Sequence, residues 1–185
     1  MRLGNGFIAP TSNSTTIEDA TTDLGLSGYR FKDLYLSGGV YLGGTGAANK
    51  LEDYEEGTWT PTVIRLATAP SVTYGIQNGT YTKVGRLVTV TFDCRFSALT
   101  GGSGTFVLAG LPFTSINSAS SGSMAEHTSG FQYPSGRTYA TFETSGGTSF
   151  LYILCSGTAV STSSGINISD HNGYIIGSIT YETSA

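Results

Sequence analysis

Between residues 24 and 46, apolar and aromatic residues recur at about every second position and are interrupted by Ser-Gly or Gly-Gly pairs. A spacing of two is the period of a β-strand, because successive side chains point to opposite faces of an extended chain. The glycine pairs at 38–39 and 43–44 end or turn each strand after only a few residues. Strands that short cannot bury both faces within one chain, so the pattern predicts an oligomeric β stem covered by other copies of itself. The apolar residues of this stem are Leu24, Leu26, Tyr29, Phe31, Leu34, Leu36, Val40 and Leu42.

From residue 58 onward, alternating apolar and polar residues form short runs that are bounded by Gly, Ser and Asn. About eight strands at roughly ten-residue spacing are typical of a β-sandwich or jelly roll. The clearest strand is Arg86 to Phe96, which carries one apolar face and one polar face. The expected strands or hairpins lie at 58–65, 72–84, 86–96, 104–113, 137–155 and 166–182.

Turn residues predict how these strands are joined. Asn78-Gly79 supplies both positive-φ positions of a type I′ turn, so 72–84 is expected to be a hairpin. A second Asn-Gly, at 172–173, is expected to turn the hairpin of 166–182. The strand at 150–155 is apolar on both faces, which places it centrally in the sheet or at a subunit interface. The segment 115–136 has little pattern and is expected to be a long loop of functional importance or without fixed structure.

Composition supports an all-β protein and narrows its partners. The 185 residues include 26 Gly, 9 Phe and 11 Tyr, and no window shows the three-to-four residue spacing of a helix. The formal net charge of −4 and the scattered Lys and Arg residues exclude a basic groove for nucleic acid. The chain shows no apolar segment of membrane-spanning length, so we expect no membrane insertion. It shows no signal-peptide pattern, so we expect it to be synthesised in a cytosol.

Two segments carry a resemblance to a known family. SGYRFKDLYLSGGVYLGG at 27–44, followed by KLEDYEEGTWTP at 50–61, resembles the neck of bacteriophage and prophage tail-fibre proteins. The rest of the chain is similar to that family more loosely, through YTKVG at 81–85 and GLPF at 110–113. The resemblance implies a homotrimeric virion protein that is assembled in the host cytoplasm and whose C-terminal β head contacts the host surface.

Together, pattern and resemblance divide the chain into three parts. Residues 1–23 are expected to be an extended segment that attaches to a tail or baseplate protein of the virion, although a disordered tail fits the sequence equally. Residues 24–56 are expected to form an intertwined β neck with an acidic joint, and residues 57–185 an antiparallel sandwich-like or jelly-roll-like head. Glycines in the neck are expected to let the chains approach closely. The trimer interface is assigned to Leu34, Leu36, Val40, Leu42 and Trp59.

The acidic joint and the cysteines each allow two interpretations. Clustered carboxylates between 52 and 56 suit Ca²⁺, but the alternation of an EF-hand is absent, so we favour an outward-facing solvated joint and expect no metal. Cys94 and Cys155 lie in apolar strand patterns and are expected to be buried free thiols; a disulfide is the alternative, disfavoured by assembly in a cytosol. Trp59 is expected to plug the junction of neck and head, with sugar stacking as its alternative role.

No catalytic motif stands out, so we expect neither an enzyme nor a cofactor. Binding by loops on a β scaffold remains, and aromatic residues flanked by polar groups suit a host-surface glycan, with a surface protein as the alternative. Three functions are therefore weighed: a receptor-binding tail fibre, a non-receptor fibre or decoration protein of head or baseplate, and a polysaccharide depolymerase. The residues assigned to receptor binding are His127, Phe131, Tyr133, Arg137, Asp170 and His171; Phe131 and Tyr133 suit core or trimer contacts equally.

Overall fold

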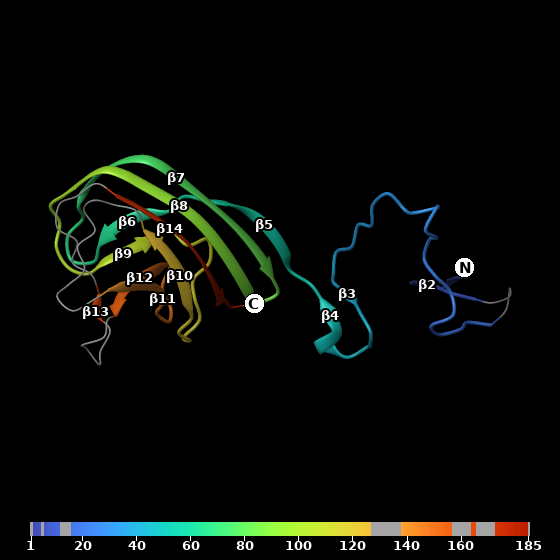
Figure 1. Cartoon of the computed structure of the whole chain (residues 1–185). Helices are drawn as coiled ribbons and strands as arrows, with labels where there is room; N and C mark the ends of the chain where they lie inside the picture. The colour runs from blue at the N-terminus through green and yellow to red at the C-terminus, as the bar shows by residue number, and fades with distance from the viewer. Residues whose placement is uncertain are drawn as a thin grey trace. The chain divides into compact units, whose positions relative to one another are not determined.

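The computed structural model describes residues 2–4, 6–11, 16–126, 138–156, 164–165 and 173–184. These residues fall into two compact units, Met1–Gly38 and Gly39–Ala185, which are considered separately (Figure 1). Within the described ranges the secondary structure is β, apart from one short 3-10 helix, η1 (Ala47–Asn49). The all-β prediction is therefore confirmed.

The first unit contains little regular structure in a single chain. A small antiparallel hairpin joins β1 (Arg2–Gly4) to β2 (Phe7–Ala9). From residue 24 to residue 38 the only pairing is an isolated bridge between Leu26 and Tyr29. The second unit opens with the short pair β3 (Val40–Tyr41) and β4 (Lys50–Leu51). The strands expected along the stem are thus two residues long or absent in one chain.

The remaining strands form one curled antiparallel sheet in the order β5-β7-β8-β14-β10-β11-β12-β9-β6, with β13 paired to β12 (Figure 1). The bounds of these strands are β5 (Tyr54–Trp59), β6 (Thr62–Arg65), β7 (Ser71–Val84), β8 (Leu87–Thr100), β9 (Phe106–Ala109), β10 (Ser121–Glu126), β11 (Tyr139–Thr144), β12 (Phe150–Ser156), β13 (Ser164–Gly165) and β14 (Gly173–Glu182).

The sheet folds back on itself at β10 and so becomes two layers. β10 pairs with β11 through 121–122 and with β14 through 123–126. A Cβ on Gly122 would lie 2.5 Å from the backbone oxygen of Ser178, so this bend requires glycine. The chain also crosses from one layer to the other between β5 and β6, the two ends of the strand order, through Thr60 and Pro61. Proline lacks a backbone N–H, which favours the end of a strand at this crossing.

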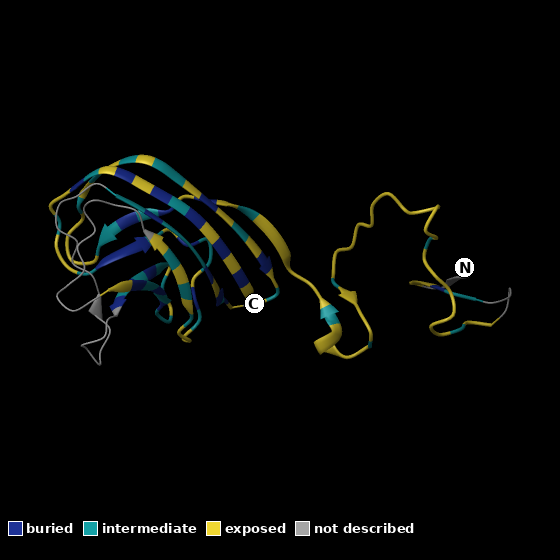
Figure 2. Ribbon diagram, viewed as in Figure 1, coloured by how far each residue is buried: buried dark blue, intermediate teal, exposed yellow. Residues whose placement is uncertain are grey.

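We call β5, β7, β8, β14 and residues 123–126 the front layer, and residues 121–122 with β11, β12, β9 and β6 the back layer. The core lies between them, and burial alternates along β7 and β8 as expected for strands with one wet face (Figure 2). This sandwich-like arrangement is consistent with the predicted head.

One row of residues across the front layer explains much of the core packing. In register, the row runs Trp59, Gly79, Phe92, Gly177 and Met124, so large side chains alternate with glycine. The Trp59 and Phe92 rings meet edge to face at 5.7 Å, and Phe92 meets Phe142 of the back layer at 5.0 Å. A Cβ on Gly79 would lie 2.5 Å from the Trp59 indole nitrogen. The glycines therefore leave the space that the neighbouring rings fill.

Two strand predictions were wrong. Asn78-Gly79 does not turn a hairpin but lies in the middle of the continuous strand β7, because Gly79 serves the packing of Trp59. The segment 115–136, expected to be a loop, contains the strand β10. Its sequence is mostly polar, and it pairs with β11 and β14, which follow later in the chain. The expected hairpin partner of β14, residues 166–169, lies outside the described residues.

Other strand predictions were confirmed. β8 (Leu87–Thr100) matches the expected Arg86–Phe96 strand except for Arg86 and extends it to Thr100, with the predicted apolar face buried. The turn at Gly85, where φ is +57°, joins it to β7. β11 and β12 form the predicted antiparallel pair, and β12 is central because β9 pairs with its other edge.

Candidate functional site

The stem exposes an unusual amount of apolar surface in one chain. Every apolar residue assigned to it is exposed, from 37% for Val40 to 79% for Tyr29 (Figure 2). Leu34, Leu36 and Leu42, assigned to the trimer interface, are each more than half exposed. Large exposed apolar surface marks an interaction site, because leaving it in water costs free energy that a partner can recover. The stem therefore has the character of an association surface.

Within the first unit, this surface is hollowed. A groove of about 1150 Å³ is lined by apolar side chains of the hairpin and of the stem, with Arg30 and two aspartates at its margin. Its backbone is held by two hydrogen bonds between Leu26 and Tyr29, of 2.8 and 3.1 Å. The apolar lining residues are Ile8, Leu24, Leu26, Phe31 and Leu34.

In the second unit, the glycines of the stem are in close contact with other residues of the same chain. A Cβ on Gly39 would lie 2.5 Å from the Leu51 backbone oxygen, and one on Gly44 would lie 2.7 Å from the Asn49 side-chain oxygen. Asn49 also donates from Nδ2 to the Leu42 carbonyl at 3.3 Å, next to the backbone bond from Leu42 to Asn49 at 2.9 Å. These glycines are thus explained by close approach within the chain, without a neighbouring copy.

Each carboxylate of the acidic joint has a partner within the chain, a lysine for two of them and a tyrosine hydroxyl for the other two. Glu52 pairs with Lys50, and Asp53 pairs with Lys83. The hydroxyl of Tyr54 donates to Glu56 at 2.8 Å, and that hydrogen bond raises the tyrosine pKa. Glu55 accepts a hydrogen bond from the Tyr81 hydroxyl, which raises the pKa of Tyr81 in the same way. Among the described residues, no group of three or more His, Cys, Asp or Glu side chains could hold a metal ion.

Lys83 anchors this joint to the head. Its side chain is 5% exposed, its ammonium contacts the Asp53 carboxylate, and it lies 5.5 Å from the centre of the Phe113 ring. Tyr81 packs edge to face on the same ring at 5.3 Å. The sequence analysis missed Lys83, although its parity with Gly79 and Tyr81 places it on the inward face of the strand. Asp53 has a φ of +60°, a conformation that Asp tolerates better than most residues.

We expect Asp53→Asn to destabilise the head by about 2 kcal/mol, because the buried Lys83 ammonium loses its partner charge. Thermal unfolding should then begin about 4–8 °C lower. The matched control is Glu52→Gln, because its solvent-accessible pair with Lys50 should contribute less than about 1 kcal/mol. Lys83→Met in the Asp53→Asn background should recover stability. Equal unfolding temperatures for Asp53→Asn and the unmodified chain would contradict an anchoring ion pair.

Trp59 does not lie where the sequence analysis placed it. Its side chain is 8% exposed and belongs to the core of the head, in contact with Phe92, so it is not presented to a neighbouring copy. Its assignment to the trimer interface is corrected: the indole is needed to fill the space above Gly79. The strand that carries it, β5, begins at Tyr54, so residues 54–56 of the expected neck pair with β7 of the head.

The remaining predicted residues are placed as follows. Cys94 and Cys155 are both buried and not joined in a disulfide, which confirms the expectation of buried thiols, and burial raises the Cys94 pKa to about 12. The residues assigned to receptor binding all lie outside the described residues: His127, Phe131, Tyr133, Arg137, Asp170 and His171.

Fold and surface together define an all-β protein with a curled antiparallel sheet and a segment, residues 24–42, whose apolar side chains are exposed. No protein-family model, no curated protein and no solved structure matches the chain. In the described part of the chain, no helix is long and apolar enough to span a membrane.

Proposed function

We propose that this chain is a bacteriophage tail-fibre protein that assembles as a homotrimer through its stem and presents its β head to a receptor on the host surface. The observation that carries the proposal is the exposure of the stem: a run of apolar side chains from Leu24 to Leu42 has no cover in one chain. Identical copies are the natural cover, because the exposed residues recur with the strand period and can pair with themselves.

The choice of a trimer and of a phage particle rests on the resemblance of residues 27–44 and 50–61 to tail-fibre necks. In the acidic joint, two of the four carboxylates are paired with lysines, and the other two accept hydrogen bonds from neutral tyrosine hydroxyls, so two negative charges per copy remain. Three such joints would therefore repel one another near a common axis, which supports an outward-facing joint in the proposed trimer.

In this proposal, residues 1–23 attach the fibre to a tail or baseplate protein, and the virion tail is where the protein works. The head binds a host-surface glycan or protein. Its rigid two-layer sheet, with the core described above, suits a scaffold for recognition. A non-receptor fibre or decoration protein would share the stem but not host binding, and a depolymerase would also degrade the polysaccharide.

Two measurements test the proposal. Light scattering of the full chain should give three times the monomer mass of 19.3 kDa. Adsorption of the purified protein to bacterial cells that the phage infects should be saturable and should leave surface polysaccharide intact. A stable monomer at micromolar concentration would overturn the trimer. A trimer that does not adsorb would be the non-receptor fibre, and polysaccharide breakdown would indicate the depolymerase.

A further inference from the structure

The outer face of the front layer carries an ordered array of hydroxyl groups. Threonines and serines of adjacent strands lie opposite one another in the pairing register. Thr80 and Thr91 are hydrogen-bonded at 2.7 Å, and Ser123 and Ser178 at 3.2 Å. Because these bonds hold the hydroxyls in place before any ligand arrives, part of the entropic cost of binding is already met. This hydroxyl row consists of Thr58, Thr80, Thr91, Ser178 and Ser123.

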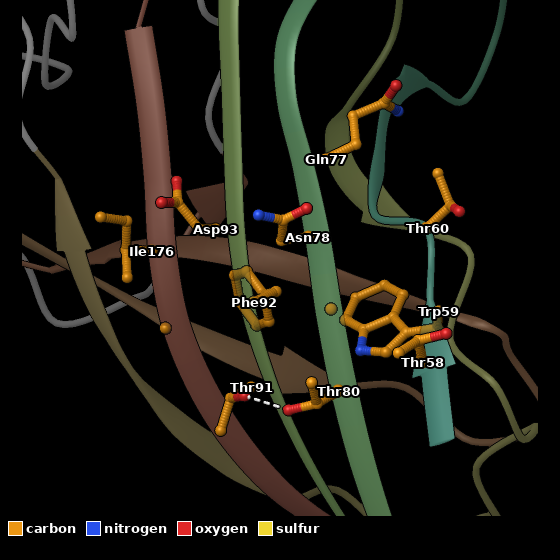
Figure 3. A pocket seen from close by; sticks show the side chains of 12 residues that line it. Thr58, Trp59, Thr60, Gln77, Asn78, Thr80, Thr91, Phe92, Asp93 and Ile176 are labelled. Atoms are coloured by element: carbon orange, nitrogen blue, oxygen red, sulfur yellow. Dashed lines mark hydrogen bonds between the residues drawn. The ribbon is translucent and has the colours of Figure 1, made fainter.

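A second row runs parallel to it, two residues away along β7, β8 and β14. Asn78 of β7 lies opposite Asp93 of β8, which lies opposite Ile176 of β14. Between the two rows is a shallow hollow of about 730 Å³ (Figure 3). Gly79 and Gly177 line it with backbone only, which leaves room between the rows. We call this feature the front hollow; Thr58, Thr60, Asn78, Thr80, Thr91, Asp93 and Ile176 supply its outward side chains, and Trp59, Gln77 and Phe92 complete the lining (Figure 3).

The two main polar groups of the front hollow differ in their hydrogen bonding: the Asp93 carboxylate has a partner within the chain, whereas the Asn78 carboxamide has none among the described residues. Arg95 donates to Asp93 from Nε at 2.8 Å and from Nη2 at 2.6 Å, so the carboxylate is fixed and its charge is balanced. The same guanidinium lies 5.1 Å from the centre of the Tyr174 ring. Asn78 is exposed, and no residue of the described ranges hydrogen-bonds its side chain. An unpaired carboxamide can donate two hydrogen bonds and accept two.

The chemistry of the hollow selects its ligand. It offers hydroxyls, a free carboxamide and a charge-balanced carboxylate, with the apolar Ile176 at one side (Figure 3). Neither lysine nor arginine is among the described residues that line it, so a phosphate or nucleic acid is not favoured. Adjacent hydroxyls of a sugar ring match paired donors and acceptors, and the C–H face of the ring matches an aliphatic side chain. The volume lies within the range of sites for small ligands.

We infer that the front hollow is a binding site for a neutral saccharide, with Asn78 and Asp93 as the principal hydrogen-bonding groups. The inference rests on the proposed function in one respect: in a fibre, this saccharide would be part of the receptor. The inference places saccharide recognition on the outer face of the sheet, whereas the sequence predicted it in loops.

The test is a titration of the full chain, by NMR, with methyl glucoside, methyl galactoside, methyl mannoside and N-acetylglucosamine. At least one sugar should bind with a Kd of about 1 mM, as expected for a shallow site, and should shift signals of residues 78–80 and 91–93. Asn78→Ala should weaken that binding about tenfold, the loss of one hydrogen-bonding group. Thr82→Ala is the matched control, since Thr82 is exposed on β7 but does not line the hollow.

Absence of binding by all four sugars, or equal binding by Asn78→Ala and the unmodified chain, overturns the inference. Light scattering and cell adsorption of the same samples separate this failure from that of the fibre. If Asn78→Ala remains trimeric and adsorbs like the unmodified chain, the receptor is bound elsewhere and the fibre proposal stands. If the unmodified chain is monomeric and does not adsorb, while sugar binding still depends on Asn78, the fibre proposal fails and the saccharide site stands.

Discussion

Leu36→Asp should convert the trimer into monomers. Leu36 is half exposed in one chain, and the proposed assembly covers it with the same residue from two other copies. The substitution would bury three carboxylates close together, and each costs several kcal/mol unless it is paired or protonated. Light scattering should give the mass of one chain instead of three. Val40→Asp should have the same effect, because Val40 lies in the same apolar run.

Ser37→Asp is the matched control for this experiment. Ser37 is exposed and polar, and it is the neighbour of Leu36, so the opposite face of an extended strand carries it. A trimer that survives Ser37→Asp but not Leu36→Asp would locate the interface on the apolar face. The monomeric variant should keep the thermal transition of the head, since the head has its own core. A trimer unaffected by Leu36→Asp would mean that the stem is not buried in the assembly.

The fold was predictable where a strand carries its own amphipathic pattern. In β8, apolar residues alternate from Val88 to Phe96, because one face packs in the core and the other meets solvent. β10 could not be predicted in the same way. Its sequence, SGSMAE, is short and polar, and what makes it a strand is the pairing with β14 and β11, which the chain reaches only later. Local propensity is overridden there by tertiary pairing.

The error at Asn78-Gly79 has a related cause. The dipeptide is a strong turn signal when only neighbours in sequence are considered. In the fold, glycine is required at position 79 because the Trp59 indole, twenty residues earlier in the chain, occupies the space of its side chain. Asn78 is then left on the outer face, where it meets Asp93 across the ladder. The contact between Trp59 and Gly79 therefore explains why residues 78–79 are part of a strand and why Asn78 lies on the outer face of the sheet.

The front hollow could not be predicted from the sequence, because it also depends on tertiary pairing. Its lining residues are separated by up to 119 positions, from Thr58 to Gly177, and no short motif joins them. Only the register of β7, β8 and β14 brings Asn78, Asp93 and Ile176 together. The stem was the opposite case: its exposed residues follow one another along the chain, so their common character could be seen directly.

Gly177→Ala should destabilise the head more than any other single-methyl change along β14. The added Cβ would lie 2.5 Å from the Ser123 backbone oxygen, 2.6 Å from the Phe142 ring and 3.1 Å from the Phe92 ring. The oxygen belongs to the ladder partner of β14 and the rings are wedged between the two layers, so none of the three can move aside cheaply. We expect a loss of about 3 kcal/mol, the upper part of the range for overpacking.

Chemical denaturation of the full chain measures this loss, followed by the fluorescence of Trp59, the only tryptophan and part of the same row. Gly75→Ala is the matched control. Gly75 also lies inside a long strand of the front layer, but a Cβ there would meet only the Arg95 backbone oxygen at 3.9 Å, an ordinary contact. The midpoint for Gly75→Ala should stay at or slightly above that of the unmodified chain, because alanine restricts the unfolded state. Equal denaturation midpoints for Gly177→Ala and Gly75→Ala would mean that the front layer can accommodate a methyl group at Gly177. The alternation of rings and glycines would then not determine how the two layers pack.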